Sequence, residues 1–115
     1  MPQHRVRLSC LHDKRDDRNL GYALTGIGLS YLAEGTSTSA LVPLERAFKI
    51  REAQETDPSH RAETRFALAR ALWSRPAERQ RALALSRSAR GDCGDDKKAA
   101  AEIDAWLAQA RAEKL

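Results

Sequence analysis

Residues that could bind a metal are few and widely spaced in this chain of 115 residues. The histidine and cysteine ligands would have to come from His4, Cys10 and His12 near the start and from His60 and Cys93 much further along. Zinc ligands instead occur as closely spaced pairs, so this distribution does not fit a metal site. We therefore expect no metal and no cofactor.

Carboxylates and serines do not form a catalytic arrangement either. The pairs Asp16-Asp17 and Asp95-Asp96 lie where helices are expected to begin, and capping and the helix dipole explain them there. Ser9, Ser30, Ser86 and Ser88 have no histidine in the sequence neighbourhood that a nucleophile and its base would suggest. We therefore expect that the protein is not an enzyme.

Composition restricts the fold class and the compartment. Aromatic residues make up 5% of the chain, charged residues 31% and the net charge is +4, while the abundant Ala, Leu, Arg and Glu favour helices over strands. No apolar run approaches the roughly 18 residues of a membrane span, and the first ten residues lack the apolar stretch of a secretion signal. The composition predicts an all-α cytoplasmic protein with no membrane partner, in which Cys10 and Cys93 are free thiols.

Five helices are predicted from periodic apolar residues and from the signals that begin and end helices. Gly35 and Gly91 are expected to end the first and the fourth helix, and Pro58 to open the third. Residues 1–18 would be a leader, either disordered or a short docking helix, and residues 19–115 a single domain. The first predicted helix spans about residues 19–33, the second follows the capping hydroxyls of residues 36–39 and runs to about residue 53, and the others span about residues 58–73, 77–90 and 95–113.

An internal repeat relates the predicted hairpins 19–55 and 57–91. In each copy, apolar and small residues recur at spacings of three and four, as helices that pack closely require. The second copy is degenerate, because Arg65 stands where the first copy has the apolar Leu24. The copies read Leu24-x-x-Ile27-Gly28-x-x-Tyr31 with Ala40-x-x-x-Leu44-x-x-Ala47, and Arg65-x-x-Leu68-Ala69-x-x-Leu72 with Ala82-x-x-Leu85-x-x-x-Ala89.

This pattern resembles the tetratricopeptide repeat (TPR) family over residues 19–110. The resemblance implies antiparallel helical hairpins stacked as a short right-handed superhelix, with residues 95–113 as a C-terminal capping helix. In that arrangement Gly28 and Ala47 are small because the two helices of the hairpin cross closest there. The pattern is also similar to the terminal repeats of large bacterial signalling proteins such as serine/threonine kinases. That similarity implies a detached regulatory region that acts as a scaffold.

The resemblance further implies a groove that binds a partner peptide or protein along the first helix of each hairpin. Aromatic side chains would anchor the partner there, and Arg70 would hold a carboxylate. For Phe66 and Trp73 a second interpretation is open, in which they pack with Trp106 against the final helix as part of the core. The groove residues would be Tyr22, Thr25, Leu29, Leu32, Glu63, Phe66, Arg70 and Trp73.

Positive charge is concentrated in the second hairpin, where eight arginines against two glutamates give residues 61–90 a net charge of +6. This face suggests an alternative function as a basic nucleic-acid-binding accessory protein. The competing interpretation is a solvated face whose arginines cover apolar surface and meet acids such as Glu45, Asp92 or Asp95. No aromatic residues interleave with the arginines, so nucleic acid is the less favoured partner. Four arginines share an arc of about 120° on an ideal helix: Arg75, Arg79, Arg87 and Arg90.

A short array leaves the outer face of its first hairpin uncovered, because each repeat needs a neighbour to bury that face. We therefore expect either that residues 1–18 fold over this end or that two chains associate there as a homodimer.

Overall fold

The structure is a computed structural model that describes the backbone of residues 14–114 and the side chains of residues 17–113. The described part is 87% helical and contains no strand, which confirms the all-α class. Residues 1–13 of the expected leader lie outside it. The elements are α2 (Lys14–Ala33), α3 (Ser37–Gln54), α4 (Pro58–Leu72), the short 3-10 helix η1 (Pro76–Glu78), α5 (Arg79–Asp92) and α6 (Lys97–Lys114).

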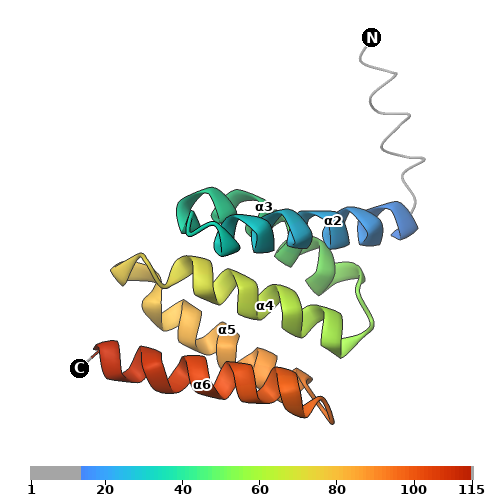
Figure 1. The fold of residues 1–115 in the computed structure, drawn as a ribbon. Helices are drawn as coiled ribbons and strands as arrows, with labels where there is room; N and C mark the ends of the chain where they lie inside the picture. The colour runs from blue at the N-terminus through green and yellow to red at the C-terminus, as the bar shows by residue number, and fades with distance from the viewer. Residues whose placement is uncertain (1–13, 115) are drawn as a thin grey trace.

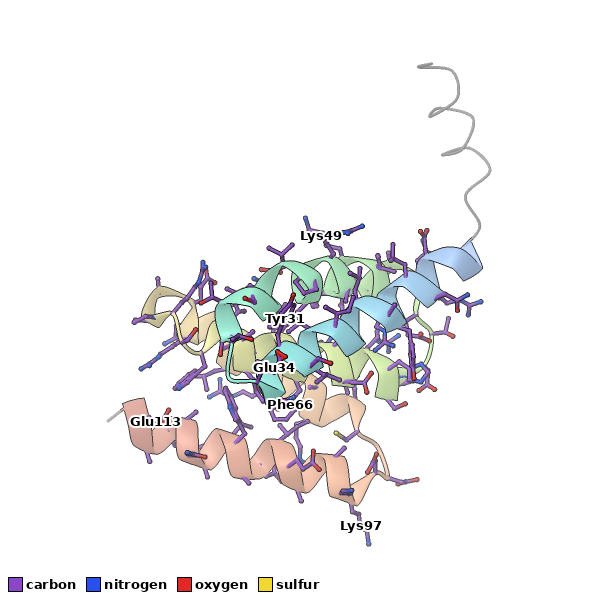
Figure 2. All side chains as sticks on the ribbon, turned by 45° about the horizontal axis from the view of Figure 1, so that its top comes forward. Tyr31, Glu34, Lys49, Phe66, Lys97 and Glu113 are labelled. Atoms are coloured by element: carbon purple, nitrogen blue, oxygen red, sulfur yellow. The ribbon has the colours of Figure 1, made fainter. Side chains whose placement is uncertain are left out.

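The helices lie in order along the molecule (Figure 1). α2 and α3 form the first hairpin, α4 and α5 form the second, and α6 packs beside α5 at the far end. α4 also contacts both α3 and α2, so the second hairpin is stacked on the first. Lys49 of α3 and Lys97 of α6 project at opposite ends of this stack (Figure 2). The right-handed superhelical twist stays a prediction.

Local signals explain the end of α2 and the start of α4. Gly35 has a φ of +80°, and the amides of Gly35 and Thr36 donate to the carbonyls of Leu32 and Tyr31 and close the last turn of α2. Asp57 caps α4 by accepting a 2.9 Å hydrogen bond from the Ser59 amide, next to the proline that opens the helix.

Two predicted ends differ from the structure. α5 continues through Gly91, and the turn that follows it contains Gly94 with a φ of +55°. Gly91 is therefore an ordinary helical residue, and the position that needs a left-handed residue comes three residues later. α2 begins before residue 19, so residues 14–18 of the expected leader belong to the first helix.

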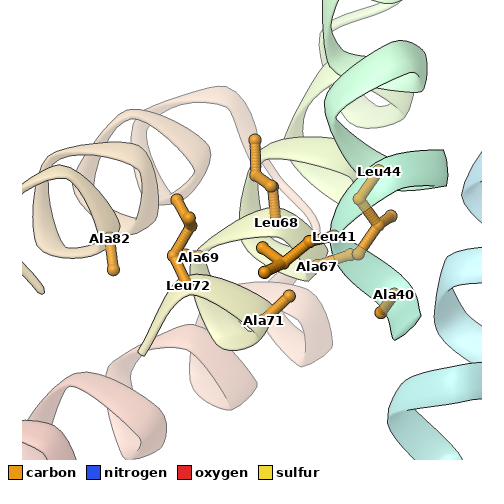
Figure 3. Packing of buried hydrophobic residues seen from close by; sticks show 9 residues of the cluster. All are labelled: Ala40, Leu41, Leu44, Ala67, Leu68, Ala69, Ala71, Leu72 and Ala82. Carbon is orange, nitrogen blue, oxygen red and sulfur yellow. The ribbon is translucent and has the colours of Figure 1, made fainter. Parts of the chain in front are cut away.

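The main core is built around α4 with small side chains. Alanines on α3, α4 and α5 let the helices approach closely, and leucines fill the space between α3 and α4 (Figure 3). A second cluster of Ala62, Ala89, Cys93, Ala100 and Ile103 joins α6 to the second hairpin. The main cluster consists of Ala40, Leu41, Leu44, Ala67, Leu68, Ala69, Ala71, Leu72 and Ala82.

Gly28 marks the closest contact between α2 and α3. A Cβ atom at this position would lie 2.3 Å from Cγ of Leu44, far inside van der Waals contact. Ala47 is also fully buried. The small residue at Gly28 is thus required by packing, as the repeat pattern predicts.

Candidate functional site

A pocket of about 380 Å³ lies between α4 and α6, with Leu29 of α2 at its edge. Phe66 and Ile103 supply apolar walls from α4 and α6. Arg70 brings a positive charge to the pocket, and Glu63, Asp96 and Glu102 bring negative charges. It therefore combines an apolar surface with a small number of charged groups, as sites that bind a side chain or small ligand commonly do.

Arg70 brings a buried polar atom without a hydrogen-bond partner to this pocket. Its guanidinium carbon lies 4.9 Å from the centre of the Phe66 ring, over the ring face. Nε of Arg70 is buried without a hydrogen-bond partner, and the guanidinium donates no hydrogen bond to any other described residue. Burial lowers the pKa of Arg70, and the negative charge of Glu102 opposes that shift. An anion that entered the pocket would supply the missing acceptors.

The aromatic residues of α4 pack against α6. The Trp106 ring meets Phe66 edge to face at 5.8 Å and Trp73 at 5.3 Å between centroids. Nε1 of Trp73 donates a 2.7 Å hydrogen bond to Glu113 of α6. Phe66 and Trp73 thus pack with Trp106 against the final helix, which is the second of the two interpretations of these residues given above. Phe66 in addition lines the pocket, whereas Trp73 does not.

The groove residues expected on α2 do not come together. Thr25 is buried, where its hydroxyl donates to the Gly21 carbonyl and lies 2.9 Å from Oγ1 of Thr64. The expectation that Thr25 lines a groove is therefore wrong, because α4 covers it. Tyr22 is exposed, but it lies over Arg51 at a separate shallow pocket.

Leu29 and Leu32, the other two groove residues expected on α2, lie in different surroundings. Leu29 reaches the pocket, while Leu32 packs against the main core and is not part of the pocket lining. Glu63 of α4 does line the pocket, and its carboxylate also accepts a 3.0 Å hydrogen bond from Arg51. Of the eight expected groove residues, the structure brings Leu29, Glu63, Phe66 and Arg70 into one pocket.

Arg51 is a buried residue that the sequence analysis did not single out. Only 1% of it is exposed, and its Nη1 donates to the His60 carbonyl, to Glu63 and to Oγ1 of Thr64 at 2.9 to 3.0 Å. These bonds join α3 to α4. The sequence does contain a signal that Arg51 is buried, because this residue continues the helical spacing of the apolar Leu44 and Ala47 along α3.

The four arginines of the expected basic patch have different surroundings. Arg79 lies 4.6 Å above the Trp73 ring and donates to the Trp73 carbonyl, and Arg90 pairs with Asp104 at 2.9 Å. Arg75 and Arg87 are exposed.

Two of the acids expected beside that patch pair with other arginines. Glu45 binds Arg81 through two hydrogen bonds, and Asp92 binds Arg65, which also holds Glu52. Arg65, Arg81 and Arg90 of the second hairpin thus pair with carboxylates, as the solvated-face interpretation expects, but of the four arginines of the expected patch Arg90 alone does so.

Two further observations concern the described residues. None of the helices between residues 14 and 114 has the length and apolar character to span a membrane. Within the same range, no three His, Cys, Asp or Glu side chains gather where they could hold a metal ion.

Cys93 is a buried free thiol that lines the pocket, and burial raises its pKa. Comparison of the chain with protein-family models, with curated proteins and with solved structures finds no match.

Proposed function

We propose that the protein is a protein-interaction module that binds a segment of a partner protein in the pocket between α4 and α6. The observation that carries this proposal is the unpaired guanidinium of Arg70 beside an apolar wall. The Nε of Arg70 is buried without an acceptor, which costs free energy in the unliganded protein, and a carboxylate ligand that accepts from this atom removes that cost.

The lining also restricts the chemistry of the partner. Phe66, Leu29 and Ile103 fit an apolar side chain, and Arg70 fits a carboxylate next to it. Glu63, Asp96 and Glu102 lie in the same lining and would repel further acidic groups. The proposed ligand is therefore a peptide segment with one carboxylate beside a large apolar residue, rather than a strongly acidic segment.

The hairpin arrangement supports the same proposal. α2, α4 and α6 contribute to the pocket, and by the TPR resemblance the first two are the first helices of their hairpins. In our proposal the module serves as a scaffold, and the resemblance to signalling proteins suggests a regulatory region of such a protein as its setting.

A displayed library of random peptides, selected on the full-length protein, tests the proposal. We expect the selected peptides to share an acidic residue next to a large apolar one. The tryptophan fluorescence of the protein then gives the affinity of a selected peptide, because the Trp106 ring contacts Phe66. Enrichment of peptides without that pair contradicts the proposal.

The matched variants are Arg70→Gln and Arg87→Gln, which remove the same charge inside the pocket and at an exposed site of α5. Loss of a charge-assisted hydrogen bond costs about 1.5–3 kcal/mol. We therefore expect Arg70→Gln to weaken the selected peptide by about tenfold to a hundredfold and Arg87→Gln to leave it unchanged. Equal affinities for the two variants contradict the role of Arg70.

A further inference from the structure

A second pocket, of about 250 Å³, lies where the first half of α2 meets the end of α3 and the start of α4. Figure 1 shows these segments at one end of the molecule. This pocket is separate from the one between α4 and α6, because the two linings share only His60. We refer to it as the α2 pocket, and its lining consists of Arg18, Asn19, Tyr22, Arg51, Glu55 and His60.

Arg51 brings a buried donor without a partner to the α2 pocket. Only 1% of this residue is exposed, and its Nε has no hydrogen-bond partner. Nη1 donates to three protein oxygens, of which one belongs to a carboxylate, that of Glu63. The Glu63 side chain is 46% exposed, so water screens its charge. A bound ion is one of the few physical explanations for a buried polar atom that the protein leaves unsatisfied.

Gly21 allows α2 to close over the stem of Arg51. A Cβ atom at Gly21 would lie 3.3 Å from Cγ of Arg51 and 3.1 Å from Cγ2 of Ile50, which is tighter than ordinary contact. The next residue, Tyr22, lies over the guanidinium, with 5.7 Å between the ring centre and Cζ. Because Tyr22 also lines the pocket, the buried guanidinium lies next to it.

α2 adds further donors to the same pocket. Arg18 precedes Tyr22 by four residues, so the two side chains lie on one side of the helix, and Asn19 follows Arg18. Arg18 is exposed and forms no ion pair with another residue in the range 17–113. Its guanidinium, the Asn19 amide and the Tyr22 hydroxyl are therefore donors that an anion in the pocket can use.

Glu55 is the one carboxylate among the six lining residues, and protein donors already hold both of its oxygens. Oε1 accepts hydrogen bonds from the amides of Thr56 and Asp57 at 3.1 and 3.0 Å. Oε2 lies 3.3 Å from Nδ1 of His60. Two arginines against this single carboxylate leave the lining with a net positive charge.

We propose that the α2 pocket binds a phosphate group, either as inorganic phosphate or as the monoester of a small molecule. Two guanidinium groups and an amide offer more donors than the two oxygens of a planar carboxylate accept, and the oxygens of a phosphate dianion match them better. The proposal does not rest on the peptide site between α4 and α6, because neither Arg18 nor Arg51 lines that site.

Isothermal titration calorimetry of the full chain tests the proposal with inorganic phosphate and with phenyl phosphate, at constant ionic strength in sodium chloride. We expect one saturable site per chain for at least one probe, and the tighter probe distinguishes the free ion from a monoester. Acetate should bind at least about tenfold more weakly than that probe, since it uses fewer of the donors. Absence of saturable binding by both probes, or acetate binding within that margin, overturns the proposal.

Arg18→Gln locates the site, and Arg46→Gln is its matched control. Both arginines are exposed on the first hairpin, and Arg46 lies outside the lining of the α2 pocket. We expect Arg18→Gln to weaken the bound probe by about tenfold and Arg46→Gln to leave its affinity unchanged. Helical circular dichroism confirms that each variant is folded, and Asn19→Ala, also at an exposed position, replaces Arg18→Gln as the test if that variant unfolds.

Three outcomes of these variants overturn the proposed site. One is an unchanged affinity in the folded Arg18→Gln or Asn19→Ala variant. Another is an equal loss in Arg46→Gln, which would indicate attraction by net charge alone. The third is loss of the probe in Arg70→Gln with Arg18→Gln unaffected, which would place the anion in the pocket between α4 and α6 instead.

Discussion

Replacing Gly28 with alanine tests whether the repeat pattern reflects a real packing requirement. The added Cβ would lie 2.3 Å from Cγ and 2.4 Å from Cδ2 of Leu44, a side chain that is itself fully buried. Leu44 therefore has little freedom to withdraw, and α2 would have to move away from α3. The same hairpin supplies a control, because a Cβ at Gly26 would meet nothing within 4 Å.

Alanine is expected to change the free energy of unfolding in opposite directions at Gly26 and at Gly28. Alanine in place of glycine inside a helix stabilises by about 0.5–1 kcal/mol, and Gly26→Ala should show that gain. Gly28→Ala makes the same gain but introduces overpacking that costs about 1–3 kcal/mol or more. We therefore expect Gly28→Ala to be less stable than Gly26→Ala by about 2 kcal/mol.

Urea unfolding followed by helical circular dichroism measures the difference, at one protein concentration because association changes apparent stability. In a Leu44→Ala background the clash is removed, so the penalty of Gly28→Ala should shrink or vanish. The reasoning is refuted if Gly28→Ala is as stable as Gly26→Ala, or if its penalty is the same with and without the Leu44 side chain.

Two more predictions concern the attachment of α6 and the acid stability of the fold. Trp106→Ala removes the ring that packs on Phe66 and Trp73. In the same urea assay this change should lower the free energy of unfolding by about 2–3 kcal/mol, which is less than the loss of a fully buried tryptophan causes. The hydrogen bond from Arg81 lowers the pKa of Glu45 in the folded protein below its ordinary value of 4.5. The pair therefore stabilises the fold fully above that ordinary value, and this stabilisation is lost as the pH falls through the lower pKa of the folded state. Glu45→Gln should therefore make the urea midpoint fall less steeply between about pH 5 and pH 3, and an unchanged slope would contradict the role of the pair.

Helices were predictable from this sequence because their signals are local. Apolar spacing, Gly35 after α2 and Asp57-Pro58 before α4 act within a few residues, and the structure has helices at those places. The end of α5 was not predictable in the same way. Gly91 and Gly94 are both glycines after an apolar stripe, and only the positive φ of Gly94 distinguishes them.

The candidate site was predictable only in part, because it depends on how neighbouring helices pack. The TPR resemblance placed Arg70 and Phe66 in a groove along α4, and the structure has both in the pocket. It also placed Thr25 in that groove, whereas α4 covers this residue through Thr64. The contribution of Ile103 to the pocket could not be derived, since it depends on the position of α6.

The buried polar network of Arg51 connects the fold to the proposed site. Thr25 of α2 contacts Thr64 of α4, and Thr64 accepts a hydrogen bond from Arg51 of α3, so one network joins three helices. Apolar contacts alone allow neighbouring helices to slide, whereas the three hydrogen bonds that Nη1 of Arg51 donates form in one arrangement of the helices. Because Leu29 belongs to the same helix as Thr25 and reaches the pocket, we infer that the network holds α2 where it completes the pocket wall.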